Sequence, residues 1–296
     1  MNSPPDGEDD ATGMNVAVNV APRRIDWSSI IERAADIVRS YDTSVTLRQL
    51  FYRLVSEQVI PNTTTAYKRL SSLTAEARRQ GDFPDLIDRG RQIHRDPFWD
   101  SAADAIEALL DQFRLDRTAG QDTSIYLGVE KAGMVVQLQS WFGDLGIPVL
   151  ALGGYSSQTY AATVRRHVGA QDRFAVLLYA GDFDPSGEDI DRDFIEQTNC
   201  WLEVVRVALT AEQVREHRLP INPGKASDSR AAGFIERHGS LMQVELDALD
   251  PTALRSMFQA AVDEFWDTSA YRRVLDREQS ARRRLAELAA SIGGDE

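Results

Sequence analysis

The middle of the chain alternates between apolar runs and amphipathic stretches in a way that predicts a parallel β-sheet. Residues 124–129 and 174–180 are short apolar runs bounded by turn residues, which is typical of strands buried on both faces. Between them, residues 134–142 and 157–167 have apolar positions at helical spacing and flank a third apolar run at 147–152. This succession predicts an α/β fold with a doubly wound, Rossmann-like parallel sheet.

The N-terminal third has a different pattern, with three predicted helices. Residues 27–40, 47–55 and 64–79 each carry an apolar stripe, and Thr46 with Gln49 has the spacing of a capping box before the second helix. The third helix directs basic side chains outward, which favours a helix-turn-helix or winged-helix DNA-binding unit; the alternative is a plain helical bundle with solvated arginines. The cations that we expect to contact DNA, including one from the middle of the chain, are Arg53, Lys68, Arg69, Arg78, Arg79 and Lys131.

Loop and charge signals divide the chain into four segments. Residues 1–22 carry four acids and no bases and lack periodicity, which predicts a disordered acidic tail. Residues 23–118 hold the three helices, a predicted wing and a linking helix at 101–113. Residues 119–224 hold the parallel sheet, and residues 225–296 form a C-terminal helical extension.

Composition narrows the possible classes of protein. The 296-residue chain has a net charge of −13, although residues 23–100 carry 13 Lys and Arg against 11 Asp and Glu, so any DNA contact must be local. Cys200 is the only cysteine and the four histidines are scattered, which indicates neither a disulfide framework nor a zinc site. No apolar run has the length of a membrane span and no signal peptide is evident, so we expect a cytoplasmic, nucleoid-associated protein.

Acidic residues directly follow two of the predicted strands. Glu130 follows the first, and Asp182 and Asp184 follow the third in a turn forced by Pro185 and Gly187. Parallel α/β sheets bind ligands beyond the carboxyl ends of their strands, so we expect the three carboxylates to converge. A hard divalent cation would relieve their mutual repulsion, which predicts a Mg²⁺ site for phosphoryl chemistry, with Mn²⁺ as a possible substitute.

Two other interpretations of the acidic turn stay open at this level. Most Asp-x-Asp pairs on protein surfaces are solvated turn residues without a ligand. The sequence D-F-D-P-S at 182–186 also has the D-x-D-x-S/T form of a phosphatase of the haloacid dehalogenase type. Such enzymes usually place that motif on the first strand of the domain, whereas here a strand–helix–strand–helix unit precedes it, which argues against this assignment.

The sequences around the two strand ends resemble a known domain. V-E-K-A-G at 129–133 and G-D-F-D-P-S-G at 181–187 are similar to the two halves of the Toprim domain of topoisomerases, primases and small nucleases. The D-P-x-G-x-x-I form at 184–190 looks most like the A subunit of topoisomerase VI and its meiotic double-strand-break relative. The resemblance implies a winged-helix domain joined to a Toprim domain, with Glu130, Asp182 and Asp184 as Mg²⁺ ligands.

The same resemblance implies a nucleophile. L-R-Q-L-F-Y-R at 47–53 is similar to the R-D-x-Y-Y motif of those A subunits, with Arg48 at the motif arginine and Tyr52 at the catalytic tyrosine. Gln49 and Phe51 depart from the motif without removing the nucleophile. The family then implies that Tyr52 attacks double-stranded DNA to form a 5′-phosphotyrosine, assisted by Arg48 and Glu130. From the residues alone, Tyr52 can also be a half-buried packing residue whose hydroxyl reaches solvent.

The resemblance also bears on partners. It implies a homodimer in which the tyrosine of one subunit works with the Toprim acids of the other, and strand passage would need a separate ATPase subunit because this chain has no ATPase signature. The alternatives are a Toprim nuclease that hydrolyses DNA with metal-bound water, suited to plasmid or phage defence, and a non-catalytic DNA-binding module. V-E-L-D-A-L at 244–249 is similar to an E-L-E-A-L-type segment late in the A subunits, although its own pattern predicts half of an amphipathic helix.

Overall fold

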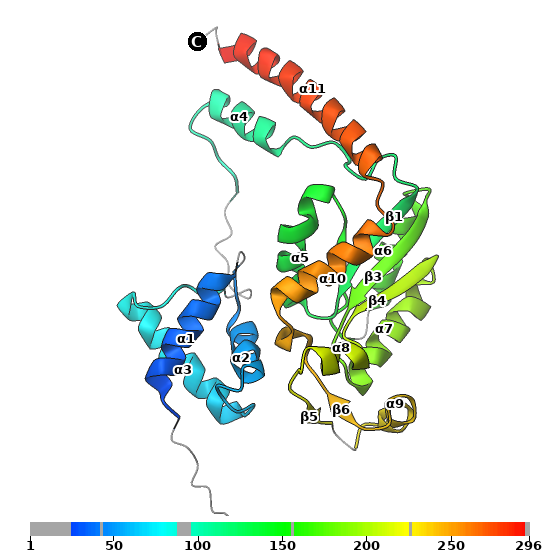
Figure 1. Ribbon diagram of the computed structural model, residues 1–296. Coiled ribbons are helices and arrows are strands. Elements are labelled where there is room, and N and C mark those ends of the chain that lie inside the picture. The colour runs from blue at the N-terminus through cyan, green and yellow to red at the C-terminus, as the bar shows by residue number, and fades with distance from the viewer. Residues whose placement is uncertain (1–24, 42–43, 88–95, 155–156, 225–226, 294–296) are drawn as a thin grey trace, which may run out of the picture.

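A parallel β-sheet organises the middle of the chain. The computed structural model describes residues 25–41, 44–87, 96–154, 157–224 and 227–293, and it has a mixed α/β architecture with a four-stranded parallel sheet (Figure 1). In the sheet order β2-β1-β3-β4, the strands are β2 (Val149–Ala151), β1 (Thr123–Val129), β3 (Phe174–Ala180) and β4 (Glu203–Ala208). The predicted α/β class and parallel sheet are therefore confirmed.

The register of β1 and β3 brings their carboxyl ends level with one another. Thr123 lies opposite Phe174 at one end of the pair, and Val129 lies opposite Ala180 at the other. Side chains alternate across each strand, so Leu127 packs into the core on one face of the sheet and Tyr126 into the core on the other. The residues that follow Val129 and Ala180 therefore lie close together at the same edge of the sheet.

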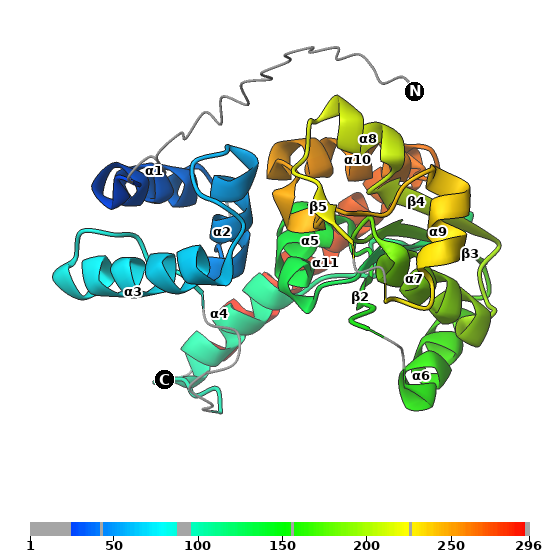
Figure 2. The ribbon, with the colours of Figure 1, turned by 90° about the horizontal axis from the view of Figure 1, so that it is seen from below.

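Helices cover both faces of this sheet (Figures 1 and 2). On one face, α5 (Val135–Phe142) and α10 (Pro251–Asp263) share a core with the strands, and the rings of Phe142 and Phe258 lie 6.2 Å apart. On the other face, α6 (Gln158–Gly169) and α7 (Pro185–Thr198) contribute apolar side chains to a second core. This doubly wound arrangement is the one predicted from the alternating strand and helix patterns.

Three N-terminal helices form a separate core beside the sheet domain. They are α1 (Trp27–Ser40), α2 (Leu47–Ser56) and α3 (Thr64–Gln80), and Thr46 and Gln49 form the predicted capping box. Of the three, α2 lies nearest the sheet domain in both views (Figures 1 and 2). The helices are confirmed, but the predicted wing is not seen in the described parts of residues 82–101, which contain no strand.

The remaining short elements connect these layers. Within the part of the chain that the structure describes, none of the helices has the length and apolar composition needed to cross a membrane. The strands β5 (Asn222–Pro223) and β6 (Met242–Gln243) form a separate antiparallel pair. The short elements are η1 (Ala132–Met134), η2 (Gly143–Leu145), α8 (Ala211–Glu216), β5 (Asn222–Pro223), α9 (Ala231–His238), β6 (Met242–Gln243) and η3 (Leu246–Ala248).

The segment at 244–249 does not form the half-helix that its pattern predicts. Val244 bridges to Phe183 in an antiparallel pair, and the chain then makes only the single 3-10 turn η3. The apolar residues Val244, Leu246 and Leu249 are all buried against the sheet core. Tertiary contacts with the acidic turn after β3 therefore override the local helical pattern.

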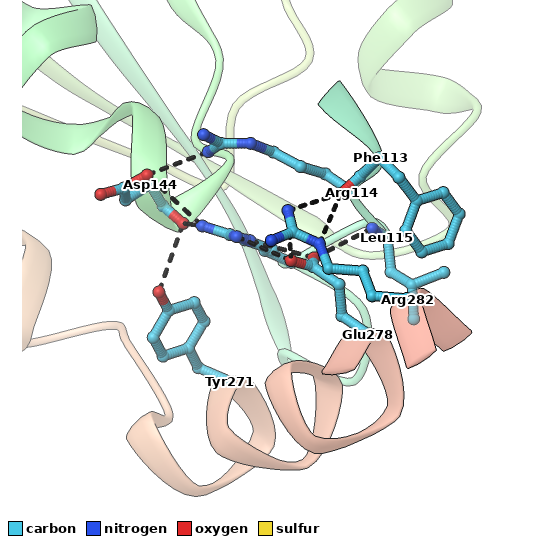
Figure 3. Close-up of polar contacts among 8 residues, drawn as sticks. Phe113, Arg114, Leu115, Asp144, Tyr271, Glu278 and Arg282 are labelled. Carbon is cyan, nitrogen blue, oxygen red and sulfur yellow. Dashed lines mark hydrogen bonds and ion pairs between the residues drawn. The ribbon is translucent and has the colours of Figure 1, made fainter. Parts of the chain in front are cut away.

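A two-helix arm projects from the sheet domain. It consists of α4 (Ala102–Gln112), which confirms the predicted linking helix, and α11 (Thr268–Gly293), which packs beside α4 (Figure 1). Figure 3 shows the polar cluster at its base, where Glu278 of α11 accepts hydrogen bonds from the Leu115 amide at 3.0 Å and Arg117 Nη2 at 2.8 Å. Only 4% of the Glu278 side chain is exposed. This buried carboxylate anchors the arm to the chain that enters β1.

We predict that Glu278→Gln lowers the free energy of unfolding by about 3 kcal/mol, because Arg117 loses its buried counter-charge. The hydrogen bond from Arg117 lowers the pKa of Glu278, so this stabilisation is present above the unfolded-state pKa and is lost as pH falls through the lowered value. Urea denaturation at neutral pH measures the effect. Glu76→Gln, which breaks the exposed pair with Arg79, should leave the free energy of unfolding unchanged. Equal losses in both variants would disprove the anchoring role.

Candidate functional site

Two of the predicted acidic residues lie next to each other where β1 and β3 end. The Asp182 amide donates a hydrogen bond to Glu130 Oε2 at 2.9 Å, and Asp182 is only 7% exposed. Gly187 permits this packing, because a Cβ at this position would collide with the carbonyl oxygen of Asp182 and lie 3.3 Å from Glu130 Oε2. The first turn of α7 can therefore lie against both strand ends.

Asp184 has a different role from the other two acids. Its Oδ1 accepts a hydrogen bond from the Gly187 amide at 2.7 Å and caps α7, whose first residue is Pro185. Within the described ranges, no group of three or more His, Cys, Asp and Glu residues is arranged to hold a metal ion. The structure thus brings Glu130 and Asp182 together, while the third predicted ligand is engaged by the helix.

Lys131 lies among the acids rather than on the surface. Its Nζ is 2.8 Å from Asp182 Oδ1, pairs closely with Glu245 and is 3.8 Å from Asp247 Oδ2. Burial disfavours its charge, but Asp182, Asp247 and Glu245 raise the pKa of Lys131 above its ordinary value. A cation therefore occupies the position between the carboxylates, and their hard oxygen donors are those that Mg²⁺ prefers.

Tyr52 reaches this acidic cluster from the helical domain. Its hydroxyl donates a hydrogen bond to Glu245 Oε1 at 3.2 Å, and Arg48 Nη2 donates to Glu245 Oε2 at 2.8 Å. The Arg48 guanidinium lies 5.3 Å from the centre of the Tyr52 ring, and Lys131 Nζ lies 5.9 Å from it. Burial and the charge of Glu245 raise the pKa of Tyr52 to about 12, although both cations oppose the shift.

Two acids of the cluster were missed as site residues. Glu245 and Asp247 are 8% and 7% exposed, and Arg48 contacts both, with Arg48 Nε 3.6 Å from Asp247 Oδ2. Between them, the Leu246 amide donates to Asp182 Oδ1 at 2.8 Å. The family resemblance marked this segment, but its helical pattern did not indicate that both acids would face the same site. The extended residue Glu245 followed by a 3-10 turn is what turns them toward Lys131 and Arg48.

The predicted DNA-contacting cations occupy two different environments. Lys68, Arg69 and Arg79 are exposed on α3, and Arg78 beside them is half-buried and donates from Nε to the Thr74 carbonyl at 3.2 Å. Arg53 is only 17% exposed and lies 3.2 Å from Asp250 Oδ2, so it joins α2 to the start of α10. Lys68 and Arg69 therefore form the basic surface of α3, with Arg79 paired to Glu76 on the same helix, whereas Arg53 and Lys131 are engaged between the two cores.

No family model matches the chain, and no curated protein matches it. What the site can do chemically must follow from its own side chains: a phenol, an arginine, a buried lysine and four carboxylates from two separately packed cores. A phenol hydroxyl, cationic groups and carboxylate oxygens placed together are the kinds of group that can bind and cleave a phosphodiester.

The pKa of Asp182 gives a test of this geometry. Burial raises it to about 7, Lys131 opposes the shift, and Glu130 and Glu245 add to it. We predict that the metal-free protein loses stability as pH rises between 3.8, the ordinary value, and about 7, because folded Asp182 retains a proton that the unfolded chain has released.

The slope contributed by Asp182 is at most about 1.4 kcal/mol per pH unit. Urea denaturation in EDTA at a series of pH values should show it, and Asp182→Asn should remove it. Asp111→Asn, on the exposed surface of α4, is the matched control and should retain it. An unchanged pH dependence in Asp182→Asn would contradict the raised pKa.

Proposed function

We propose that the chain is a Mg²⁺-dependent enzyme that cleaves double-stranded DNA, similar to the A subunit of topoisomerase VI, with Tyr52 as the nucleophile. In this proposal the three-helix domain is winged-helix-like and the sheet domain is Toprim-like. The supporting observation is the convergence of Tyr52 and Arg48 with Glu130, Lys131 and Asp182, from segments far apart in the sequence. Glu245 joins the two groups, because both Tyr52 and Lys131 contact it.

The reaction is a transesterification. The Tyr52 hydroxyl loses its proton to Glu245, which already accepts its hydrogen bond at 3.2 Å. The phenolate oxygen forms a bond to phosphorus, the bond from phosphorus to the 3′-oxygen breaks, and that oxygen takes the proton that Glu245 received from Tyr52. The products are a 5′-phosphotyrosine and a free 3′-hydroxyl. Arg48, which is half exposed beside the ring, stabilises the negative charge that develops on the phosphate.

Glu130 and Asp182, with Asp184 beside them, are the residues that would hold Mg²⁺. When bound, the metal would neutralise charge on the phosphoryl group and on the leaving 3′-oxygen. Lys131 must first leave Asp182, and an entering phosphate provides an alternative partner for its ammonium group. The acids and the lysine thus exchange partners when DNA enters the site.

DNA binding and subunit number follow from the same proposal. Lys68, Arg69 and Arg79 on the exposed face of α3 supply a local basic surface on an otherwise acidic protein. Cutting both strands requires two sites and hence a homodimer. The family resemblance implied a site shared between subunits, whereas in the single chain Tyr52 lies beside the acids of its own sheet domain, so each copy has one set of site residues. Strand passage and energy coupling would need a separate ATPase subunit, and the proposed location is the cytoplasmic nucleoid.

Hydrolysis by a metal-activated water is the second candidate. It is favoured by the state of Tyr52, whose pKa is raised to about 12 and whose hydroxyl is directed at a carboxylate. In that case the acidic residues alone would form the active centre of a nuclease, and Tyr52 would hold the helical domain against the sheet domain. The two candidates differ in whether protein remains attached to the cut end.

We predict that the wild-type protein with Mg²⁺ or Mn²⁺ nicks, linearises or relaxes supercoiled plasmid and remains bound to the 5′ ends after detergent treatment. Tyr52→Phe and Asp182→Asn should each lower cleavage by at least about 100-fold, because one removes the nucleophile and the other a buried carboxylate. Agarose gels with and without protease digestion give the readout.

Tyr271→Phe is the matched control for the tyrosine, since it removes a hydroxyl on the arm that donates to the Asp144 carbonyl at 3.3 Å, away from the acidic cluster. It should cleave like the wild type. Free ends together with an active Tyr52→Phe variant would establish the hydrolytic nuclease instead. DNA binding without cleavage under either metal would leave the non-catalytic DNA-binding module.

Lys131 provides a second test that does not depend on cleavage. We predict that Lys131→Met binds Mn²⁺ at least about tenfold more tightly than the wild type, because a positive charge 2.8 Å from Asp182 Oδ1 is removed. Electron paramagnetic resonance of free Mn²⁺ measures the affinity. Lys68→Met on exposed α3 should have no effect, and Asp182→Asn should abolish binding. Weaker binding by Lys131→Met would contradict the competition between lysine and metal.

A further inference from the structure

A second feature lies on α2 and α3 beside Tyr52. It is a pocket of about 250 Å³, and three aromatic rings, those of Phe51, Tyr52 and Tyr67, contribute to its lining. The Phe51 ring meets the Tyr52 ring at 5.3 Å and the Tyr67 ring at 5.2 Å, both edge to face. Phe51 is only 3% exposed, so it holds both tyrosines in place while they remain partly accessible.

The rest of the pocket is polar. Arg48 forms part of it and also reaches Glu245, so the pocket adjoins the acidic cluster. Asn62, Thr63 and Thr64 supply amide and hydroxyl groups at the start of α3, where Thr63 Oγ1 accepts a hydrogen bond from the Ala66 amide at 3.2 Å. Aromatic surface, hydrogen-bonding groups and one arginine are the combination that recognises a nucleobase and its phosphate.

The size of the pocket limits its occupant. Pockets for drug-sized ligands and cofactors are commonly about 300–1,000 Å³, so 250 Å³ suits a single base better than a dinucleotide or a large cofactor. A base inside a duplex is covered on both faces by its stacked neighbours and cannot present a face to Tyr52 or Tyr67. Only a base that has left the stack can enter, and leaving the stack is easiest where the base is unpaired.

We propose that this pocket binds one unstacked nucleotide of the DNA strand, next to the phosphate that Tyr52 attacks. The proposal rests on the proposed function, because Tyr52 and Arg48 belong to both the pocket and the cleavage site. It adds a preference among DNA substrates. The protein selects sites with an unpaired or readily unpaired base, such as a bulge, a mismatch or negatively supercoiled DNA, over fully paired relaxed duplex.

Fluorescence anisotropy in EDTA tests the pocket without cleavage. Two labelled duplexes of the same sequence are compared, one fully paired and one with a single-nucleotide bulge. The wild type should bind the bulged duplex about tenfold more tightly, as expected from the stacking of one base on an aromatic ring. Tyr67→Leu should reduce the preference to less than about twofold while keeping the affinity for paired duplex, and Tyr67→Phe, which keeps the ring, should retain it.

Asn62→Ala is the second variant, because Asn62 is exposed and its truncation leaves the helical core intact. It should weaken binding of the bulged duplex more than that of the paired duplex. Equal affinity of the wild type for both duplexes, or an unchanged preference in Tyr67→Leu, would overturn the proposal. Competition by a free mononucleotide as effective as the bulged duplex would also overturn it, since the pocket would then serve a free nucleotide.

The binding test of the pocket and the cleavage test of the proposed function can succeed or fail independently. A bulge preference that depends on Tyr67, in a protein that never cleaves plasmid, would support the pocket as a DNA-binding site and refute only the enzymatic role. Cleavage with a 5′-phosphotyrosine but no bulge preference would support the enzyme and refute the pocket. Failure to bind either duplex would refute both.

Discussion

The repulsion between carboxylates buried at one edge of the sheet is the constraint on which the site depends. The level register of β1 and β3 forces Glu130 and Asp182 together, and the segment at 244–249 adds Glu245 and Asp247 from the other side. Like charges this close are stable only if protons or cations offset them. In this structure Lys131 contributes from the loop after β1 and Arg48 from α2. The fold of the strand ends thus concentrates negative charge, and cationic side chains from other parts of the chain offset it.

The negative charge of this cluster also explains how the helical domain is oriented. The two cores are built from separate sets of apolar side chains, yet α2 lies against η3. Polar contacts mark this boundary: Arg48 and Tyr52 meet Glu245, and Arg53 meets Asp250. An apolar interface would remain unchanged when a phosphate or a metal arrived, whereas a contact made of charges can be replaced by competing charges. The docking of α2 on the acidic cluster through charged contacts therefore fits the proposed function, in which DNA would displace these contacts.

Much of this arrangement was readable from the sequence because it depends on local pattern. Apolar runs located β1 and β3, and Thr46 marked the start of α2 through capping, which needs only neighbouring residues. Glu245 and Asp247 were not found as site residues, because their side chains are directed by a bridge to Phe183 rather than by their own helical pattern. Lys131 was predicted to be a surface cation, because its partners are distant in the sequence. Glu245, with which it pairs, is 114 residues further along the chain. The cap that Asp184 provides to α7 was not predicted from the sequence, and it competes with the predicted role of Asp184 as a metal ligand.

The charge balance of the cluster connects its resting state with its proposed chemistry. Glu130, Asp182, Glu245 and Asp247 carry four negative charges when ionised, whereas Lys131 and Arg48 bring two positive ones. With burial, this imbalance accounts for the raised pKa values of Asp182 and Glu130, since a proton is the simplest way to remove the excess charge. A divalent cation would remove the same excess without a proton. If Arg48 and Lys131 turn to a phosphate at the same time, the acids lose both of their present partners, and the need for a cation among them becomes greater. In the proposed reaction, DNA entry and metal binding would therefore be coupled through the same carboxylates.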